Sequence, residues 1–151
     1  MNVLVTGIAG QDGFYLAEAL SNHQVFGMYR GQDEVRLDRL RQEMPQVHFL
    51  RGDITDPSSI SQAVQASEPD WVFNMAAMSY VGLSWAMPQL YMEVNALGVV
   101  NLLDAVRNYA PHAHVVQAST SEMYGNSFSA LADESTPMHP VSPYGVSKLA
   151  A

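Results

Sequence analysis

The chain has 151 residues, a length typical of one domain, and 48% of its residues are hydrophobic, which is enough for a single core. Its formal net charge is −8 and no cluster of lysine or arginine could follow a phosphate backbone, so we expect no nucleic acid partner. The absence of cysteine excludes disulfides and thiolate metal sites, and it fits the reducing cytoplasm that we predict as the location.

Two further classes of protein are disfavoured. No apolar stretch approaches the roughly 18 residues that a membrane span needs. No basic and then apolar leader precedes residue 3, so we expect neither a membrane protein nor a secreted one. The histidines are scattered, and His112 and His114 lack an evident third ligand, so we also expect no metal site.

The chain opens with the pattern of a strand, a glycine turn and a helix. An apolar run at residues 3–5 precedes Gly7, Gly10 and Gly13, and a helical pattern then continues to about residue 22. Gly7 would permit a sharp turn, Gly10 a close approach of a pyrophosphate, and Gly13 tight packing of the helix on the strand. Phosphates are favoured at a helix N-terminus. The spacing therefore predicts a dinucleotide site, with an ordinary structural turn as the alternative.

Strands and helices alternate along the rest of the chain. Apolar patterns predict strands at 24–29, 47–50, 71–75 and 115–119, and helices at 32–43, after Pro57, at 88–109 and from Tyr144, with a loop at 125–143. This alternation implies right-handed crossovers and a doubly wound parallel α/β sheet of Rossmann type, covered on both faces. Ligands of such sheets bind at the carboxyl ends of the strands.

The helix predicted at 88–109 carries apolar residues on more than one side. A second copy of the chain, or the remainder of a longer chain, would cover the side that the sheet does not. We expect a homo-oligomer formed through residues 88–110.

The end of the second strand bears on the choice of dinucleotide. Arg30 stands where an acidic residue would usually hold the ribose 2′-hydroxyl of NAD, and a cation can instead pair with a 2′-phosphate. NADP is therefore favoured over NAD. The alternative is that Arg30 is only a solvated charge in a loop. Arg36 is a second candidate cation, although on a helix it could pair with Asp33 or Asp38.

The next two strand ends offer further cofactor contacts. Asp53 follows the third strand and could accept a hydrogen bond from an adenine amino group. Its other possible role is to cap the helix at Pro57, for which Asp56 is better placed. After the fourth strand, the small side chains within residues 74–79 would allow a dinucleotide to approach the backbone closely.

The fifth strand ends in a hydroxyl-rich run at 119–122, and Tyr144 and Lys148 follow. Their i, i+4 spacing puts a phenol and an ammonium on one helix face. An ammonium beside a phenol favours the phenolate and lowers the phenol pKa from its usual value of about 10. Together with the glycine turn, these residues predict a catalytic constellation.

These motifs resemble the extended short-chain dehydrogenase/reductase family, in its nucleotide-sugar-modifying branch. The resemblance rests on segments 6–13, 52–53, 74–77, 119–120, 124–125 and 144–148, and on Asn95. Within the branch the chain is most similar to the GDP-mannose 4,6-dehydratase family, on Gln11 and Asp12 inside the glycine turn and on segments 77–79, 117–125 and 142–145.

The resemblance implies an NADP-dependent enzyme that acts on GDP-mannose or a related nucleotide sugar. Tyr144 would take the proton of the C4 hydroxyl, which Thr120 would hold, and Lys148 would assist Tyr144 and bind the nicotinamide ribose. Glu122 would remove the C5 proton, water would leave from C6, and the hydride taken from C4 would return to C6. The product would be GDP-4-keto-6-deoxymannose.

The cofactor residues that the resemblance implies are Gly7, Ala9, Gly10, Gln11, Asp12, Gly13, Arg30, Asp53, Ile54, Met75, Ala76, Ala77, Ser79, Tyr144 and Lys148. Glu122 distinguishes dehydratases from the epimerases of the branch, which usually have no carboxylate there; a loop carboxylate that caps the next turn is the alternative. Asn95 and Leu90 depart from the family, which more often has Asp and Tyr at these positions.

Other functions stay open at this point. They are a related NADP-dependent reductase of GDP-4-keto-6-deoxy sugars, a nucleotide-sugar epimerase, and a non-catalytic module that binds a dinucleotide. The family's C-terminal substrate domain would follow residue 151, so residues 1–151 are expected to be a truncated NADP-binding Rossmann domain without it. We therefore expect weak NADP binding and no turnover from the isolated chain.

Overall fold

The computed structural model of the chain describes residues 1–31, 34–126 and 131–151. The chain divides into two compact units. Unit 1 consists of residues 1–76 and 101–118, and unit 2 consists of residues 77–100 and 119–151.

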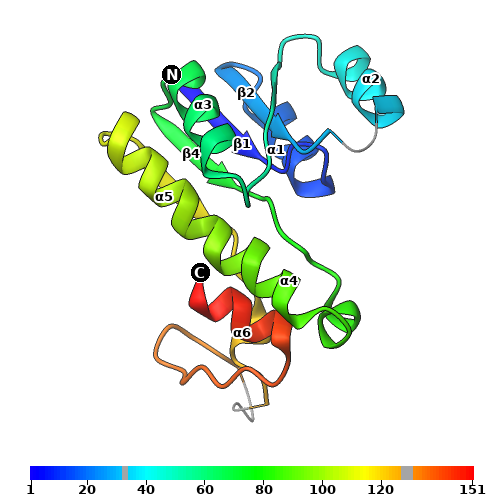
Figure 1. Cartoon of the computed structure of the whole chain (residues 1–151), viewed down its shortest axis with the longest axis vertical. Helices are drawn as coiled ribbons and strands as arrows, with labels where there is room; N and C mark the ends of the chain where they lie inside the picture. Colours follow the sequence, from blue (N-terminus) through cyan, green and yellow to red (C-terminus); the bar gives the residue numbers. More distant parts are fainter. Residues whose placement is uncertain (32–33, 127–130) are drawn as a thin grey trace. The chain divides into compact units, whose positions relative to one another are not determined.

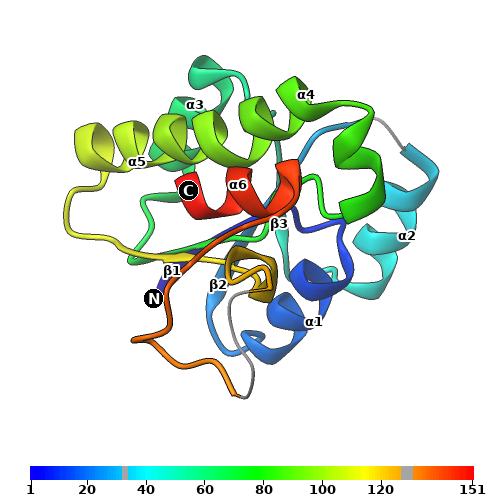
Figure 2. The ribbon, with the colours of Figure 1, turned by 90° about the horizontal axis from the view of Figure 1, so that it is seen from below.

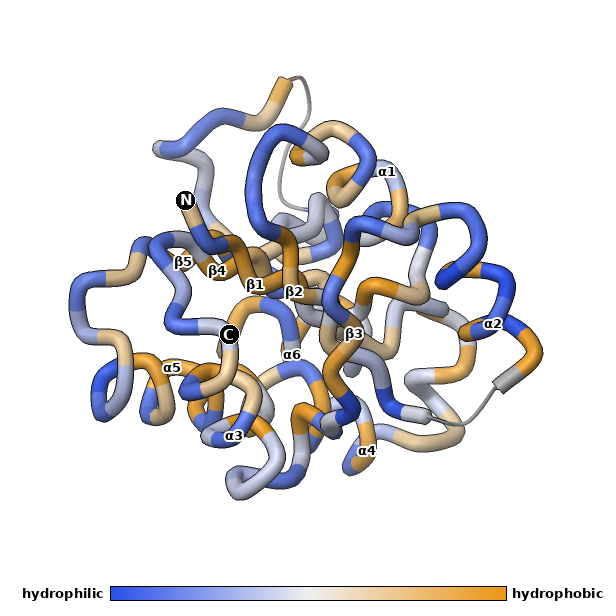
Figure 3. Tube along the Cα trace, turned by 90° about the horizontal axis from the view of Figure 1, so that it is seen from above, coloured by the Kyte–Doolittle hydropathy of each residue, from blue (hydrophilic) through white to orange (hydrophobic). Residues whose placement is uncertain are grey.

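Unit 1 is built on a parallel five-stranded sheet with the order β3-β2-β1-β4-β5 (Figures 1 and 3). The strands are β1 (Asn2–Thr6), β2 (Gln24–Tyr29), β3 (His48–Arg51), β4 (Trp71–Asn74) and β5 (His114–Gln117). The helices are α1 (Gln11–Ala19), α2 (Glu34–Glu43), α3 (Pro57–Ser67) and most of α5 (Gly98–Tyr109). The strand order reverses between β1 and β4, so the predicted doubly wound sheet of Rossmann type is confirmed.

The central strand β1 is buried on both of its faces. Val3 and Val5 lie on one face and pack in a core with Ala17 of α1 and Leu40 of α2. Leu4 is fully buried on the opposite face, on the side where α3 packs. Figure 3 shows the strands as a hydrophobic row with α1 on one side and with α3 and α5 on the other. This two-sided burial explains why the strand reads as a continuous apolar run.

The start of α3 follows from its sequence. Pro57 occupies the first turn, where its missing N–H costs nothing. The Asp56 carboxylate accepts a hydrogen bond of 3.0 Å from the Ser58 N–H and caps the helix. The assignment of the cap to Asp56 rather than Asp53 is therefore confirmed.

Unit 2 is helical. It contains η1 (Val81–Trp85), α4 (Pro88–Met92), a π-helical turn η2 (Glu93–Leu97), η3 (Ser121–Met123) and α6 (Pro143–Ala150), with the first residues of α5. Helix α6 lies beside α4 in both Figure 1 and Figure 2. The uniform helix predicted over 88–109 is wrong at its centre, because a π turn separates α4 from α5 where the Asn95 side chain bonds to other segments.

The remaining differences concern the ends of elements. The strands predicted to end at residues 75 and 119 end at Asn74 and Gln117. The helix predicted over 32–43 begins at Glu34, and residues 32–33, with Asp33, lie outside the described part of the chain. Among the described residues, no helix is both long enough and apolar enough to cross a membrane.

Candidate functional site

The residues predicted for the site fall in both units. Unit 1 contains Gly7, Ala9, Gly10, Gln11, Asp12, Gly13, Arg30, Asp53, Ile54, Met75 and Ala76. Unit 2 contains Ala77, Ser79, Thr120, Glu122, Tyr144 and Lys148.

The turn between β1 and α1 touches the end of β4 with no room for a side chain. Gly7 has a φ of +67°, and a Cβ at this position would lie 2.8 Å from the backbone of Met75 and Ala76. A Cβ at Gly13 would lie 2.5 Å from the Gly7 carbonyl oxygen. The structure therefore brings the glycine turn and residues 75–76 together, and the predicted reasons for Gly7 and Gly13 are confirmed.

A row of buried and half-buried polar side chains runs beneath this turn across three strand ends. The Thr6 hydroxyl donates to the Asn74 amide oxygen and accepts a 3.2 Å hydrogen bond from the Ala76 N–H. The Asn74 amide donates to Gln117 over 2.6 Å, and the Gln117 amide donates to the Ala118 carbonyl over 2.9 Å. Since buried polar groups stabilise a fold only when they are paired, this row fixes the relative positions of β1, β4 and β5.

The first turn of α1 has the properties of an anion site. Its N-cap is Gly10, whose own N–H donates to the Gly7 carbonyl over 2.8 Å, and no side chain among the described residues caps the helix. A Cβ at Gly10 would meet only the Gly7 carbonyl oxygen, at 3.2 Å, within the 4 Å around it. The free N–H groups of the first turn are thus accessible to phosphate oxygens, and the turn fits a pyrophosphate.

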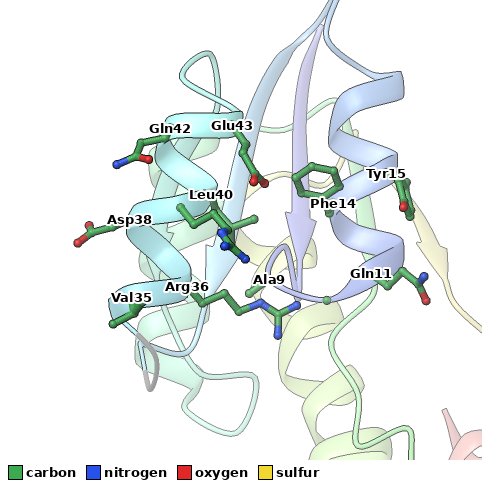
Figure 4. A pocket seen from close by; sticks show the side chains of 12 residues that line it. Ala9, Gln11, Phe14, Tyr15, Val35, Arg36, Asp38, Leu40, Gln42 and Glu43 are labelled. Atoms are coloured by element: carbon green, nitrogen blue, oxygen red, sulfur yellow. The ribbon is translucent and has the colours of Figure 1, made fainter.

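A cavity of about 920 Å³ opens beside this turn, between α1 and α2. Figure 4 shows Arg36 extending from α2 toward Ala9, with Phe14 and Glu43 across the cavity from each other. Arg39 also lines the cavity, whereas Arg30 is not in its lining. Two guanidinium groups therefore lie next to the glycine turn, and this group can pair with an anion.

The other predicted residues of unit 1 are placed as follows. Arg30 is exposed directly after β2. The Asp53 carboxylate accepts hydrogen bonds of 2.9 and 2.8 Å from the N–H and hydroxyl of Thr55. Ile54 is 5% exposed, and its carbonyl accepts a bond from Asn101. Asp53 thus retains a second carboxylate oxygen for a ligand, while the Ile54 side chain belongs to the core.

In unit 2, helix α6 carries two of the predicted catalytic side chains. Tyr144 and Lys148 are 8% and 5% exposed and lie one turn apart. The helix is capped by Ser142, whose hydroxyl accepts a 3.0 Å bond from the Gly145 N–H. A Cβ at Gly145 would lie 2.7 Å from the Glu122 carbonyl oxygen, so the first turn of α6 packs directly on the segment that carries Glu122.

The electrostatic properties of this cluster follow from burial. Burial lowers the pKa of the Lys148 ammonium below its usual 10.5. The Thr120 hydroxyl accepts a 3.2 Å bond from the Glu122 N–H and starts the η3 turn. A hydroxyl, a carboxylate, a phenol and an ammonium therefore all belong to unit 2, and such groups can take part in proton transfer. Among the described residues, no three His, Asp or Glu side chains gather to hold a metal ion.

The structure also identifies residues to which the sequence argument gave no role in the site. Tyr91 and Asn95 are fully buried on α4 and η2, and both contact the turn of α6 that carries Tyr144. Their i, i+4 spacing inside an apolar helical stretch was the available signal. Arg39, three residues after Arg36 on α2, lines the same cavity, which no local pattern indicated.

Comparison with known proteins gives a consistent result. A family model described as GDP-mannose 4,6 dehydratase matches residues 4–151. The GDP-mannose 4,6-dehydratases of Yersinia enterocolitica and Vibrio cholerae are 41% and 38% identical over 98% of this chain. The crystal structure of Thermus thermophilus UDP-glucose 4-epimerase in complex with NAD has a TM-score of 0.87 and 34% identity over 99% of this chain.

These proteins are longer than the chain. It spans 43% of the length of each dehydratase and 48% of the epimerase chain. The likeness therefore extends through nearly all of this chain and through less than half of each relative.

We predict that Gly7→Ala lowers the free energy of unfolding by about 2 kcal/mol or more, because the new Cβ meets backbone atoms and the φ is left-handed. Gly82→Ala is the matched control, since the nearest atoms to a Cβ there belong to the Tyr80 side chain at 3.5 Å, an ordinary contact. Urea unfolding followed by circular dichroism measures both variants. If Gly7→Ala and Gly82→Ala lost equal amounts of unfolding free energy, the proposed role of the close approach at Gly7 would be contradicted.

We predict that Lys148→Met raises the Tm at neutral pH, because it removes an ammonium that burial disfavours. In the unchanged protein the folded state releases this proton at a lower pH than the unfolded state does. Its stability therefore rises with pH between the lowered pKa and 10.5, and the advantage of the variant shrinks there. Thermal unfolding across this range measures the effect, with the exposed Arg107→Met as control. The prediction would be contradicted if Lys148→Met lowered the Tm by the same amount at every pH.

Proposed function

Because the chain belongs to the GDP-mannose 4,6-dehydratase family, we propose that it supplies the dinucleotide-binding and proton-transfer residues of such an enzyme. The observation that carries the proposal is the arrangement of α6, which buries Tyr144 and Lys148 one turn apart and packs against the backbone of Glu122. The substrate would be GDP-mannose or a related nucleotide sugar. As the chain spans 43% of the matched dehydratases, the activity of the whole enzyme is part of the proposal.

The glycine turn would hold the dinucleotide. The uncapped first turn of α1 would bind the pyrophosphate, and the absence of side chains at Gly7 and Gly10 leaves room for it. Asp53 would accept from the adenine, and Ala77 and Ser79, which follow β4, would contact the rest of the cofactor. When bound, the nicotinamide ring would accept a hydride from C4 of the sugar and return it to C6.

We propose NADP rather than NAD. The exposed Arg30 supports this choice, and so do Arg36 and Arg39 in the cavity beside Ala9 and Gly10. A guanidinium can pair with a 2′-phosphate by charge-assisted hydrogen bonds that a 2′-hydroxyl does not form. The arginines of α2 would thus complement Arg30, which the sequence favoured.

The residues of unit 2 would perform the proton transfers. Tyr144 as phenolate would take the proton of the C4 hydroxyl, and Thr120 would hold that hydroxyl in place. The Lys148 ammonium would favour the phenolate and bond to the nicotinamide ribose. Burial lowers the pKa of this ammonium, so little solvent surrounds it.

Glu122 would make the enzyme a dehydratase. Oxidation at C4 acidifies the proton at C5, and a carboxylate is a suitable base to remove it before water leaves from C6. An epimerase, such as the structural relative from Thermus thermophilus, is the alternative if Glu122 only shapes the loop. The Glu122 N–H is already bonded to Thr120, so its side chain is not needed for that turn.

We also propose self-association and a cytoplasmic location. Leu97, Val100 and Leu103 recur every three residues and are 59%, 58% and 45% exposed, which supports pairing of this helical surface with a second copy of the chain. The lack of cysteine supports a reducing compartment. A non-catalytic role of the chain would retain the same dinucleotide contacts.

We predict that the chain binds NADPH more tightly than NADH, and that Arg36→Ala or Arg39→Ala weakens NADPH binding about tenfold, the equivalent of one charge-assisted hydrogen bond. NADH binding should change by about twofold or less, because NADH lacks the phosphate. Fluorescence titration measures both, with Arg30→Ala tested beside them and Arg107→Ala as the surface control. Equal losses for NADPH and NADH would contradict recognition of the 2′-phosphate.

We predict that a chimera in which residues 4–151 replace the matching part of the Yersinia enterocolitica relative forms the 4-keto product from GDP-mannose. In this chimera, Glu122→Gln should lower kcat about 10³-fold yet still allow reduction of bound NADP⁺, because the C4 step precedes the C5 step. Tyr144→Phe should abolish both the product and the reduction of NADP⁺. Mass spectrometry measures the product, and absorbance measures the reduced nicotinamide.

The control for this experiment is Glu134→Gln, which removes an exposed carboxylate from the loop before α6. Epimerised sugar as the product, with normal rates for Glu122→Gln, would favour the epimerase alternative. The isolated 151-residue chain is expected to give no product, and product at an ordinary rate would refute that expectation.

A further inference from the structure

Two buried polar side chains on α4 and η2 have no part in the proposed chemistry. Tyr91 is 0% exposed and Asn95 is 1% exposed, and they are four residues apart along the chain. Burying a phenol and an amide costs free energy unless each is hydrogen-bonded. Both side chains are paired, and their partners lie in segments that the proposed function uses.

Asn95 joins the backbone after β4 to the turn of α6 that carries Tyr144. Its amide oxygen accepts a 2.8 Å hydrogen bond from the Met78 N–H, and its amide nitrogen donates to the Met78 carbonyl over 3.1 Å. The same nitrogen donates to the Ser147 hydroxyl over 3.0 Å. Ser147 in turn donates to the Tyr144 carbonyl over 2.7 Å, so the chain of bonds ends on the backbone of Tyr144.

Tyr91 makes the corresponding link through its ring. Its centroid lies 6.2 Å from that of the Tyr144 ring at an interplanar angle of 86°, an edge-to-face pair. Its hydroxyl donates to the Tyr80 carbonyl. Burial raises the pKa of Tyr91, so this phenol stays protonated and remains a donor at neutral pH.

The two residues therefore hold the same pair of segments. One segment is the backbone at 78–80, which adjoins the predicted cofactor residues Ala77 and Ser79. The other is the Tyr144 turn of α6, held at its ring by Tyr91 and at its carbonyl through Ser147. The π turn that contains Asn95 occurs at this junction, as such turns often do at functional sites.

We propose that Tyr91 and Asn95 are positioning residues for Tyr144: together they fix the orientation of its phenol and join it to the cofactor-contacting backbone at 78–80. The proposal rests on the proposed role of Tyr144 as the base. A phenol held at both its ring and its backbone reaches the substrate hydroxyl without a further loss of rotational freedom. Binding of a dinucleotide along residues 77–79 and the orientation of Tyr144 are then coupled through these two side chains.

The test is NMR of the 151-residue chain with ¹³C-labelled tyrosine rings, the Tyr144 signals being assigned with Tyr144→Phe. We expect Tyr91→Leu to shift the Tyr144 ring signals and to raise its ring-flip rate about tenfold, the loss expected for one edge-to-face pair. Tyr91→Phe, which keeps the ring and loses the hydroxyl, should restore the Tyr144 signals while those of Tyr80 still change. Tyr109→Leu, at an exposed tyrosine, is the control.

Asn95→Leu and Ser147→Ala test the second link. Both should shift the Tyr144 signals, and Ser147→Ala is mild enough to keep the fold if Asn95→Leu does not. Variants that lower the Tm but leave the Tyr144 signals unchanged would overturn the proposal and reduce Tyr91 and Asn95 to core packing.

The coupling to the cofactor is measured in a separate arm. NADPH should shift the Tyr144 signals in the unchanged chain, and these shifts should be lost in Asn95→Leu or Ser147→Ala. Equal shifts in the variants would overturn the coupling. If NADPH fails to bind any variant or the unchanged chain, the proposed function fails, whereas the effects of Tyr91 and Asn95 on Tyr144 in the ligand-free chain still decide the positioning role.

Discussion

The edge of unit 1 at which we propose that the dinucleotide binds depends on the contact between Gly7 and the backbone of residues 75–76. At this contact a Cβ would lie 2.8 Å from main-chain atoms, so the β1–α1 turn rests directly on the end of β4. The close approach lets Thr6 bond to Ala76 and Asn74 below the turn, while the first turn of α1 keeps its N–H groups free above it. These N–H groups are thus arranged before any ligand arrives, which would reduce the cost of binding an anion.

In unit 2, polar contacts hold a short helix in place. Helix α6 has eight residues, fewer than a helix needs to be stable alone. Ser142 caps it, Gly145 lets it touch the Glu122 carbonyl, and Ser147 ties it to Asn95. These contacts hold Lys148 where its charge is poorly solvated. Such a cost to stability is typical of residues kept for function.

Family membership and site geometry answer different questions. The match over residues 4–151 assigns the chain to a family, but folds of this type serve many chemistries. The choice of dinucleotide would depend on side chains at the end of β2 and along α2, where Arg30, Arg36 and Arg39 are the candidate cations. The choice between dehydration and epimerisation would depend on Glu122, whose backbone carbonyl packs against the first turn of α6.

The sequence by itself determined the local structure: the strand, glycine turn and helix at Gly7, Gly10 and Gly13, the cap at Asp56, and the parallel α/β alternation. It could do so because these features depend on backbone conformation, hydrogen bonding between near neighbours and the period of apolar residues. Only the tertiary structure decided that Arg39 lines a cavity beside the turn, that a π turn breaks the helix at Asn95, and that Tyr91 packs on Tyr144. Those features arise where segments far apart in the chain meet, and the periodicity of one segment carries no information about its partner.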